Sequence, residues 1–296
     1  MNPEPLRSKA ERFKLRGDMT VCIAARCDAK DGKSYIVTVS DTKLTTGIYS
    51  SDRATLKLRH ITTTWKCLIS GKFSQHRPLV DRIVDATHTK EGTPSYGDVS
   101  KACTDAFIAE NKRLAEESIL AQYGMTMEDF IQRRVALGDV LYERIWGEIG
   151  RIKLGCDLLV CGFDGDGFSH IFIASNPTYD NPSFITDCDY PGFGTIGTGS
   201  YLADSSLYGS EQNPASSLLI TIYNLAIAKF SAESASDVGE QTYLYVFNET
   251  GTKVKMGTVD DLEDVLREQW RSHGKPTIPQ DMFASIMEAL PEHLRG

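Results

Sequence analysis

Strand-like and helix-like segments follow one another in blocks along this chain of 296 residues. Short apolar runs, alternating or rich in β-branched residues, predict strands in the first quarter of the chain and again after residue 156. The expected strands are 21–27, 35–40, 55–58, 63–69, 157–163, 168–173, 243–247 and 252–256. Helices are expected mainly between these two groups. This order favours an α+β fold in which two stacked sheets lie between layers of helices.

Local signals refine the helices and loops. Thr126-Met127-Glu128-Asp129 has the form of a capping box and predicts one long helix over 127–149. Its apolar residues at helical spacing are expected to pack in the core or a subunit interface; they are Phe130, Ile131, Val135, Val140, Leu141, Ile145 and Trp146. Asn213-Pro214 predicts the start of a helix that runs to Ala232. Residues 42–54, rich in Thr, Ser and Gly, are expected to form a loop.

The two ends of the chain differ from its body. Residues 1–19 are polar, hold five basic and three acidic residues, and lack the apolar centre of a secretory signal. They are interpreted as a basic N-terminal extension or propeptide, or as residues upstream of a true start at Met19. The body is expected at 20–258, and 259–296 is expected to be a C-terminal helical appendage.

Composition argues against several classes of function. The formal charge is −8, and an acidic body is unsuited to binding nucleic acid. The longest apolar stretch, 218–228, is far shorter than the roughly 20 residues of a membrane-spanning helix. Seven scattered cysteines do not suggest a disulfide framework, and no metal or nucleotide motif is present. We therefore expect a cytoplasmic protein with no cofactor, metal, membrane or nucleic-acid partner.

Thr20 is the first candidate for chemistry, because it opens the buried strand 21–27. If the chain begins or is cut just before it, one residue carries both a hydroxyl nucleophile and a free α-amine. An α-amine titrates near 8, so it can act as the local base at neutral pH. Cys22 is a poorer candidate nucleophile, since it is internal and predicted to be buried.

Other residues supply what a threonine nucleophile needs. A lysine such as Lys57 would favour the alkoxide by its charge, and a buried Asp41 would hold that lysine in place. The Gly71 N–H could stabilise an oxyanion. Thr198 or Ser200, in the glycine-rich segment 192–200, could relay protons or bind the amine.

Taken in order, these residues resemble the proteasome β-subunits and their bacterial relatives among the N-terminal-nucleophile (Ntn) hydrolases. The resemblance covers Thr20 to Met256, with sixteen positions from Asp41 to Lys57 and fourteen from Lys57 to Gly71, as in the family. The Met-Thr start is most similar to the bacterial Anbu-type homologues. The landmarks are Thr20-Val21-Cys22-Ile23-Ala24, Val39-Ser40-Asp41 with Thr45-Thr46-Gly47, Lys57, Ile69-Ser70-Gly71, and the segment from Ile196 to Ala203.

The resemblance implies a four-layer αββα sandwich with an extra helical insertion and a C-terminal helical tail. It implies a threonine-type peptidase or amidohydrolase that cleaves a peptide or small amide substrate through an acyl-enzyme. It also implies a homo-oligomer, as a ring or a stacked assembly. The catalytic residues carried over are Thr20, Asp41, Lys57, Gly71, Thr198 and Ser200.

Two departures from the family keep alternatives open. Ala235 and Val238 stand where the family usually has an Asp and a Ser, so that part of the hydrogen-bond network is expected to be either missing or moved to Ser236 and Asp237. Met19 precedes the threonine instead of Gly, and retained residues 1–19 would acylate the amine. The protein would then be an inactive proteasome-like assembly or scaffold protein. A third possibility is a hydrolase acting on a non-peptide amide, or transferring the acyl group to an amine.

Overall fold

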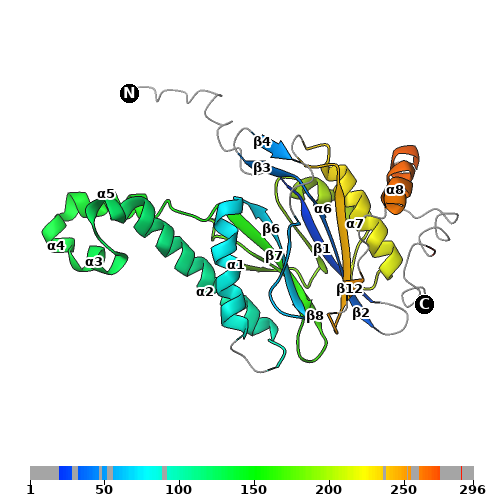
Figure 1. Cartoon of the computed structure of the whole chain (residues 1–296), viewed down its shortest axis with the longest axis horizontal. Helices are drawn as coiled ribbons and strands as arrows, with labels where there is room; N and C mark the ends of the chain where they lie inside the picture. Colours follow the sequence, from blue (N-terminus) through cyan, green and yellow to red (C-terminus); the bar gives the residue numbers. More distant parts are fainter. Residues whose placement is uncertain are drawn as a thin grey trace.

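A computed structural model provides the structure of the protein (Figure 1). It describes residues 20–28, 33–46, 49–51, 56–88, 92–235, 238–251, 253–254, 260–273 and 288. The expectations for residues 1–19, for Ser236 and Asp237, and for most of the chain beyond 273 lie outside these described residues. The described part is a mixed α+β protein with two five-stranded antiparallel sheets, in agreement with the predicted fold class.

The first sheet has the N-terminal strand near its centre. Its order is β10 (Phe193–Ile196), β1 (Cys22–Asp28), β2 (Ser34–Asp41), β11 (Thr242–Asn248) and β12 (Lys253–Val254). Because β1 pairs with strands on both sides and is covered on both faces, its residues up to Ala25 are fully buried. A continuous apolar run suits such a position.

The second sheet is built from the middle of the chain. Its order is β5 (Leu58–His60), β6 (Trp65–Gly71), β7 (Cys156–Phe163), β8 (Ser169–Ala174) and β9 (Ile185–Asp187). A separate hairpin joins β3 (Leu44–Thr46) to β4 (Tyr49–Ser51). The expectation of a loop over 42–54 was therefore wrong at this hairpin, where β-branched threonines adopt extended backbone.

The inner faces of the two sheets pack against each other. The buried cluster between them draws Cys22, Ala24 and Ile36 from the first sheet and Leu68 and Leu159 from the second. Helices cover the outer faces. They are α6 (Ser200–Gly209) and α7 (Leu218–Ala232) on the first sheet, and α1 (Phe73–His88) and α2 (Tyr96–Ala115) on the second.

The helical insertion is an arm of short helices rather than the single long helix expected over 127–149. After α2 come a π-helical turn (Glu116–Leu120), a 3₁₀ turn (Ala121–Tyr123), α3 (Met127–Gln132), α4 (Arg134–Leu137) and α5 (Asp139–Ile149). The capping box forms as predicted, with Thr126 and Asp129 bonded reciprocally. Gly138, with φ of +71°, breaks the run between α4 and α5, because helical φ is negative. Figure 1 shows the arm projecting from the second sheet.

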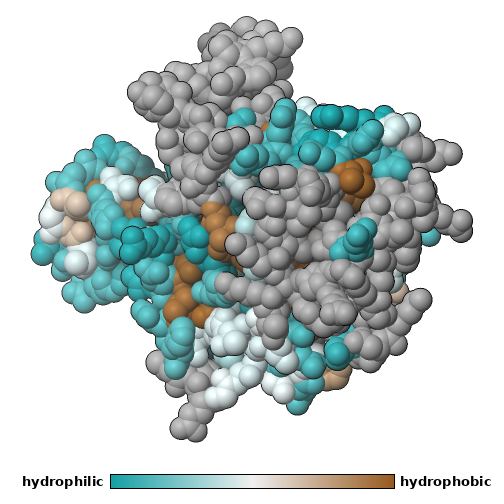
Figure 2. All heavy atoms as spheres, turned by 45° about the vertical axis from the view of Figure 1, so that its right-hand side comes forward, coloured by the Kyte–Doolittle hydropathy of each residue, from teal (hydrophilic) through white to brown (hydrophobic). Residues whose placement is uncertain are grey.

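The arm has its own small core, which confirms core packing for some of the apolar residues, and packing of the others in a subunit interface stays a prediction. Phe130 and Ile145 are buried there with Ile119 and Leu120. Val135 and Val140, in contrast, are 94% and 90% exposed. Ile131 and Trp146 are also exposed. In the face shown in Figure 2, hydrophilic residues cover most of the described surface and hydrophobic residues form separate patches.

Helices α7 and α8 (Asp260–His273) pack on one another on the outer side of the first sheet. α7 begins after Ser217, whose Oγ accepts a hydrogen bond from Ile220 N at 3.4 Å, and not at Asn213-Pro214 as predicted. The Asn213 side chain instead closes a local turn by accepting from Ala215 N at 2.9 Å. α8 supplies the helix expected at the start of the C-terminal appendage. No helix in the described part of the chain is long and apolar enough to cross a membrane.

Candidate active site

Thr20 lies at the start of β1, opposite the end of β2. Cys22 pairs with Ser40, and Asp41 N–H donates to Val21 O at 3.3 Å, so the Asp41 carboxylate faces Thr20. The Thr20 Oγ1 hydroxyl donates to Asp41 Oδ1 at 2.5 Å. Thr20 is 3% exposed and Asp41 is fully buried. The sheet register thus brings together two residues that the sequence separates by 21 positions.

Lys57 completes a compact polar group with these two residues. Its Nζ lies 2.7 Å from Asp41 Oδ1 and also donates to Thr20 Oγ1. The lysine stands just before β5, the edge strand of the second sheet, and it is buried. The threonine hydroxyl therefore lies between a carboxylate and an ammonium group, and the two opposite charges compensate each other's burial.

Backbone donors fix the Asp41 carboxylate. Oδ1 also accepts from Val21 N at 3.0 Å, while Oδ2 accepts from Lys43 N at 3.3 Å and from Gly239 N at 3.2 Å. A fully buried carboxylate needs such partners to offset its lost hydration. With both oxygens bonded, the carboxylate can present only one orientation to Thr20 and Lys57.

The glycine-rich segment wraps the backbone of Thr20. Thr20 N donates to Thr198 Oγ1 at 3.2 Å, and Gly199 N donates to Thr20 O at 3.2 Å. Gly197 has φ of +97°, and a Cβ at this position would stand 2.3 Å from Thr20 O. Only glycine fits this close approach. The segment thus places a threonine hydroxyl beside the nitrogen that would become the α-amine.

Gly71 and Ser200 have weaker links to this group. Gly71 ends β6, and Cys22 Sγ donates to Ile69 O at 3.5 Å, so this end of β6 adjoins the start of β1. The role of the Gly71 N–H toward an oxyanion stays a prediction. Ser200 is the first residue of α6, and its N–H donates to Gly197 O at 3.1 Å. Among the described residues, no hydrogen bond joins the Ser200 side chain to Thr20.

Cys22 is unsuited to act as a nucleophile. Burial raises the pKa of its thiol to about 12, although the nearby Lys57 charge acts in the opposite direction. The thiol is fully buried and donates to a backbone carbonyl. Because thiolate is the reactive form of cysteine, the neutral buried Cys22 leaves the Thr20 hydroxyl as the better candidate.

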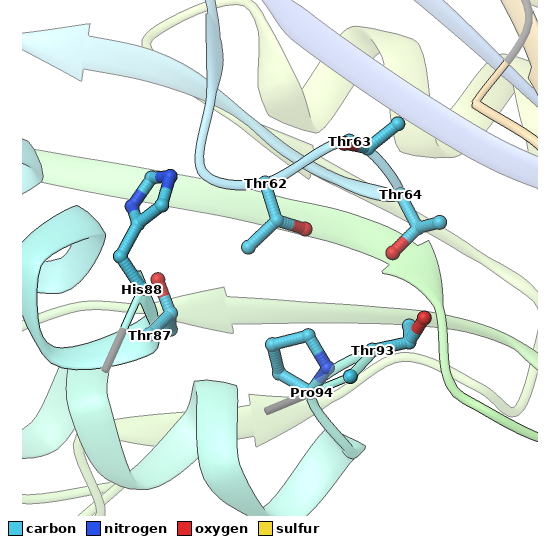
Figure 3. A pocket seen from close by; sticks show the side chains of 8 residues that line it. Thr62, Thr63, Thr64, Thr87, His88, Thr93 and Pro94 are labelled. Carbon is cyan, nitrogen blue, oxygen red and sulfur yellow. The ribbon is translucent and has the colours of Figure 1, made fainter. Parts of the chain in front are cut away.

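A pocket of about 200 Å³ lies elsewhere on the molecule (Figure 3). Its lining residues are Thr62, Thr63, Thr64, Thr87, His88, Gly92, Thr93 and Pro94. These residues adjoin the start of β6, whereas Gly71 and the candidate site adjoin its end, roughly 20 Å away along a seven-residue strand. In the part of the chain that the structure describes, no group of three or more His, Cys, Asp or Glu residues could hold a metal ion.

The site contains partners that the sequence did not reveal. The N–H groups of Lys43 and Gly239 bind Asp41, yet a backbone donor has no sequence signature. The one sequence signal for this contact was the presence of Gly239 shortly before β11. Val238, at one position where the resemblance implies a polar residue, is buried and packs with the core of the first sheet. Gly239 N–H, next to Val238, thus gives Asp41 a backbone donor in this region.

Comparison with known proteins does not place the chain in a family. No protein-family model matches it, and no curated protein matches it. The function must therefore be argued from the geometry around Thr20.

Proposed function

We propose that the protein is a proteasome-like N-terminal-threonine hydrolase that cleaves peptide or amide bonds once Thr20 carries a free α-amine. The observation that carries this proposal is the Thr20 hydroxyl held between Asp41 and Lys57, 2.5 Å from the carboxylate. A hydroxyl oriented by a carboxylate and a cation, with a free α-amine as the base, is an arrangement suited to nucleophilic acyl transfer. The two stacked sheets with helices on their outer faces support the proposal of an αββα Ntn-hydrolase fold.

The proposed reaction proceeds through acylation and then deacylation of Thr20. The α-amine of Thr20 takes the proton of Oγ1 as Oγ1 attacks the substrate carbonyl carbon, and the Lys57 charge stabilises the developing alkoxide. The C–N bond of the substrate then breaks, and the leaving amine receives that proton. Water attacks the resulting Thr20 ester and releases the acid, which restores the hydroxyl. Thr198 would orient the amine, and Gly71 N–H would bind the oxyanion.

The test is whether Thr20 is both free and reactive. Intact mass and N-terminal sequencing identify the first residue, and a threonine-directed electrophile such as a peptide epoxyketone should label Thr20. Thr20→Ala should abolish the labelling and the hydrolysis of a peptide amide. Thr104→Ala, on α2, is the matched control and should keep both. A chain with a free Thr20 amine that neither reacts nor hydrolyses would contradict the proposal.

One observation favours a second candidate, the catalytically inactive assembly or scaffold protein. In the chain as printed, Met19 is joined to Thr20, so the nitrogen that donates to Thr198 is an amide and cannot act as a base. If purified protein keeps this bond and resists the electrophile, the assembly role is favoured. Product analysis with water and with amine acceptors separates hydrolysis from acyl transfer.

A further inference from the structure

An ion cluster with one fully buried member and three partly buried members joins helices α7 and α8. Lys229 of α7 is fully buried, and its Nζ pairs with Glu233 Oε1 one turn later. Arg267 of α8 donates to the two carboxylate oxygens of Glu233 at 2.5 and 3.0 Å, and to Glu263 Oε1 at 2.6 Å. The Arg267 guanidinium also lies 4.2 Å from the centre of the Phe230 ring.

Both cations of this cluster converge on one backbone oxygen. Lys229 Nζ donates to Glu240 O at 2.6 Å, and Arg267 Nη2 donates to the same oxygen at 2.7 Å. Glu240 directly follows Gly239, whose N–H donates to Asp41 Oδ2. Two positions further on, Thr242 pairs with Asp41 in the sheet. The cluster thus holds the short segment that binds Oδ2 of the Asp41 carboxylate, whereas Lys57 binds Oδ1.

Helix packing by itself does not require this arrangement. Burial lowers the pKa of Lys229, and the Glu233 carboxylate opposes that shift. Apolar residues of similar volume can replace a buried ion cluster without loss of stability, so such clusters are weak stability devices. Two cations that donate to the same carbonyl, Glu240 O, restrict the position of that backbone segment. Gly239 needs such a constraint, because glycine has more conformational freedom to lose than any other residue.

We propose that Lys229 and Arg267 are positioning residues for the active site. They fix segment 238–240, and through the Gly239 N–H they hold the Asp41 carboxylate in the orientation that Lys57 and Thr20 require. Helix α8 then helps to position the site through Arg267 and is not a separate appendage. This inference rests on the proposed hydrolase function for its effect on turnover, but the coupling of Arg267 to Gly239 can be measured without it.

Substitution of Arg267 tests the proposal. Arg267→Met keeps an unbranched side chain in place of the aliphatic part of arginine and removes the donors, and Arg267→Lys restores a charge and a donor. Arg113→Met is the matched control, because Arg113 pairs at 2.7 Å with Glu110, a buried carboxylate covered by another pair of helices. The measurements are kcat and KM for a peptide amide on protein with a free Thr20 amine, and hydrogen exchange at the Gly239 amide.

We expect Arg267→Met to lower kcat about tenfold with KM unchanged within about twofold, since displaced catalytic groups slow the chemical step more than binding. Arg267→Lys should recover kcat to within about threefold of the unsubstituted protein. Exchange at Gly239 should be about tenfold faster in Arg267→Met, as its bond to Asp41 opens more often. Arg113→Met should leave kcat and this exchange unchanged.

The outcomes separate the two proposals. Unchanged kcat in folded Arg267→Met, with an active parent protein, would overturn the positioning role alone. An inactive parent protein would overturn the hydrolase function. The exchange measurement would still test the coupling of Arg267 to Gly239, and unchanged protection of the Gly239 amide in Arg267→Met would overturn that coupling. If Arg267→Met does not fold, Arg267→Lys carries the test, with the smaller loss of kcat and faster exchange expected of it.

Discussion

The hydroxyl of Thr20 donates to Oδ1 of Asp41 at 2.5 Å, and Lys57 Nζ contacts the same carboxylate oxygen at 2.7 Å. One carboxylate therefore orients both the Thr20 hydroxyl and the Lys57 ammonium group. The Asp41 side chain is fully buried, so neither contact is screened by water.

Asp41→Asn should remove turnover while keeping the shape of the side chain. The amide cannot neutralise Lys57, which is left buried without its counterion. We expect kcat/KM to fall at least about 100-fold and the free energy of unfolding to fall by about 3 kcal/mol, typical of breaking a buried ion pair. Kinetics and urea unfolding measure the two effects. Asp139→Asn, at a site where the side chain is 85% exposed, is the control and should change neither.

Cys22→Ala should leave the reaction at Thr20 intact. The Cys22 thiol is buried and its pKa is raised to about 12, so it contributes no thiolate at neutral pH. The loss of a small buried side chain should cost about 1 kcal/mol of unfolding free energy. Mass spectrometry of the electrophile adduct should still locate it on Thr20. An adduct that disappears with Cys22 would show that the cysteine is the nucleophile.

Gly197→Ala should damage the site through the backbone. Its φ of +97° is unfavourable for alanine, and the new Cβ would meet Thr20 O at 2.3 Å. We expect a loss of about 2–3 kcal/mol in unfolding free energy, as for other strained substitutions. Gly209→Ala at the end of α6 is the control, since no atom lies within 4 Å of its new Cβ. Equal stability of the two variants would contradict this view of Gly197.

His170 should make stability depend on pH. Its ring hydrogen-bonds Asp189 Oδ2 at 2.6 Å and faces Asp164 Oδ2 at 3.3 Å, beside Tyr96, and Arg26 lies 3.8 Å from Asp189. The bond to Asp189 raises the pKa of His170 above 6.5, although burial opposes it. A raised folded-state pKa gives stability that is complete below about 6.5 and is lost as pH rises through the folded value.

The measurement is the urea midpoint across this pH window for the parent protein and for His170→Gln. The parent should lose stability as pH rises, and the variant should show a smaller loss. His76 has a pKa lowered by burial and is present in both proteins, so its contribution cancels in the difference. Parallel pH profiles would contradict the role assigned to His170.

The arm formed by α3, α4 and α5 should contribute to self-association. Val135 and Val140 are 94% and 90% exposed, and contact with a second copy of the chain would remove their apolar surface from water. The double substitution Val135→Glu and Val140→Glu should dissociate a homo-oligomer, as measured by analytical ultracentrifugation. The free energy of unfolding should change by less than about 0.5 kcal/mol, because neither side chain packs in the core. An unchanged assembly would exclude these residues from the subunit contact.

Some of the fold could be read from local pattern. The apolar run from Val21 to Ala25 predicts a doubly covered strand, and the structure places it at an interior position of the first sheet with both faces buried. The prediction of one long helix over 127–149 was wrong, because helical spacing of apolar residues does not show where a chain reverses direction. Gly138 breaks that run, and the short helices form a small core that leaves Val135 exposed. The prediction that α7 begins at Asn213-Pro214 was also wrong. Asn213 and Ser217 are both good capping residues, and only Ser217 adjoins the helix.

By itself the sequence determined which residue types are available for chemistry and their order along the chain: Thr20, Asp41, Lys57 and the glycine-rich segment near Thr198. Only the tertiary structure decided that the first three meet and how they are held. The Gly239 N–H reaches Asp41 across 198 positions, and Lys229 and Arg267 reach Glu240 O. Every residue except proline has a backbone N–H, and every residue has a carbonyl. Their role therefore depends on how strands and helices pack, which no local sequence pattern specifies.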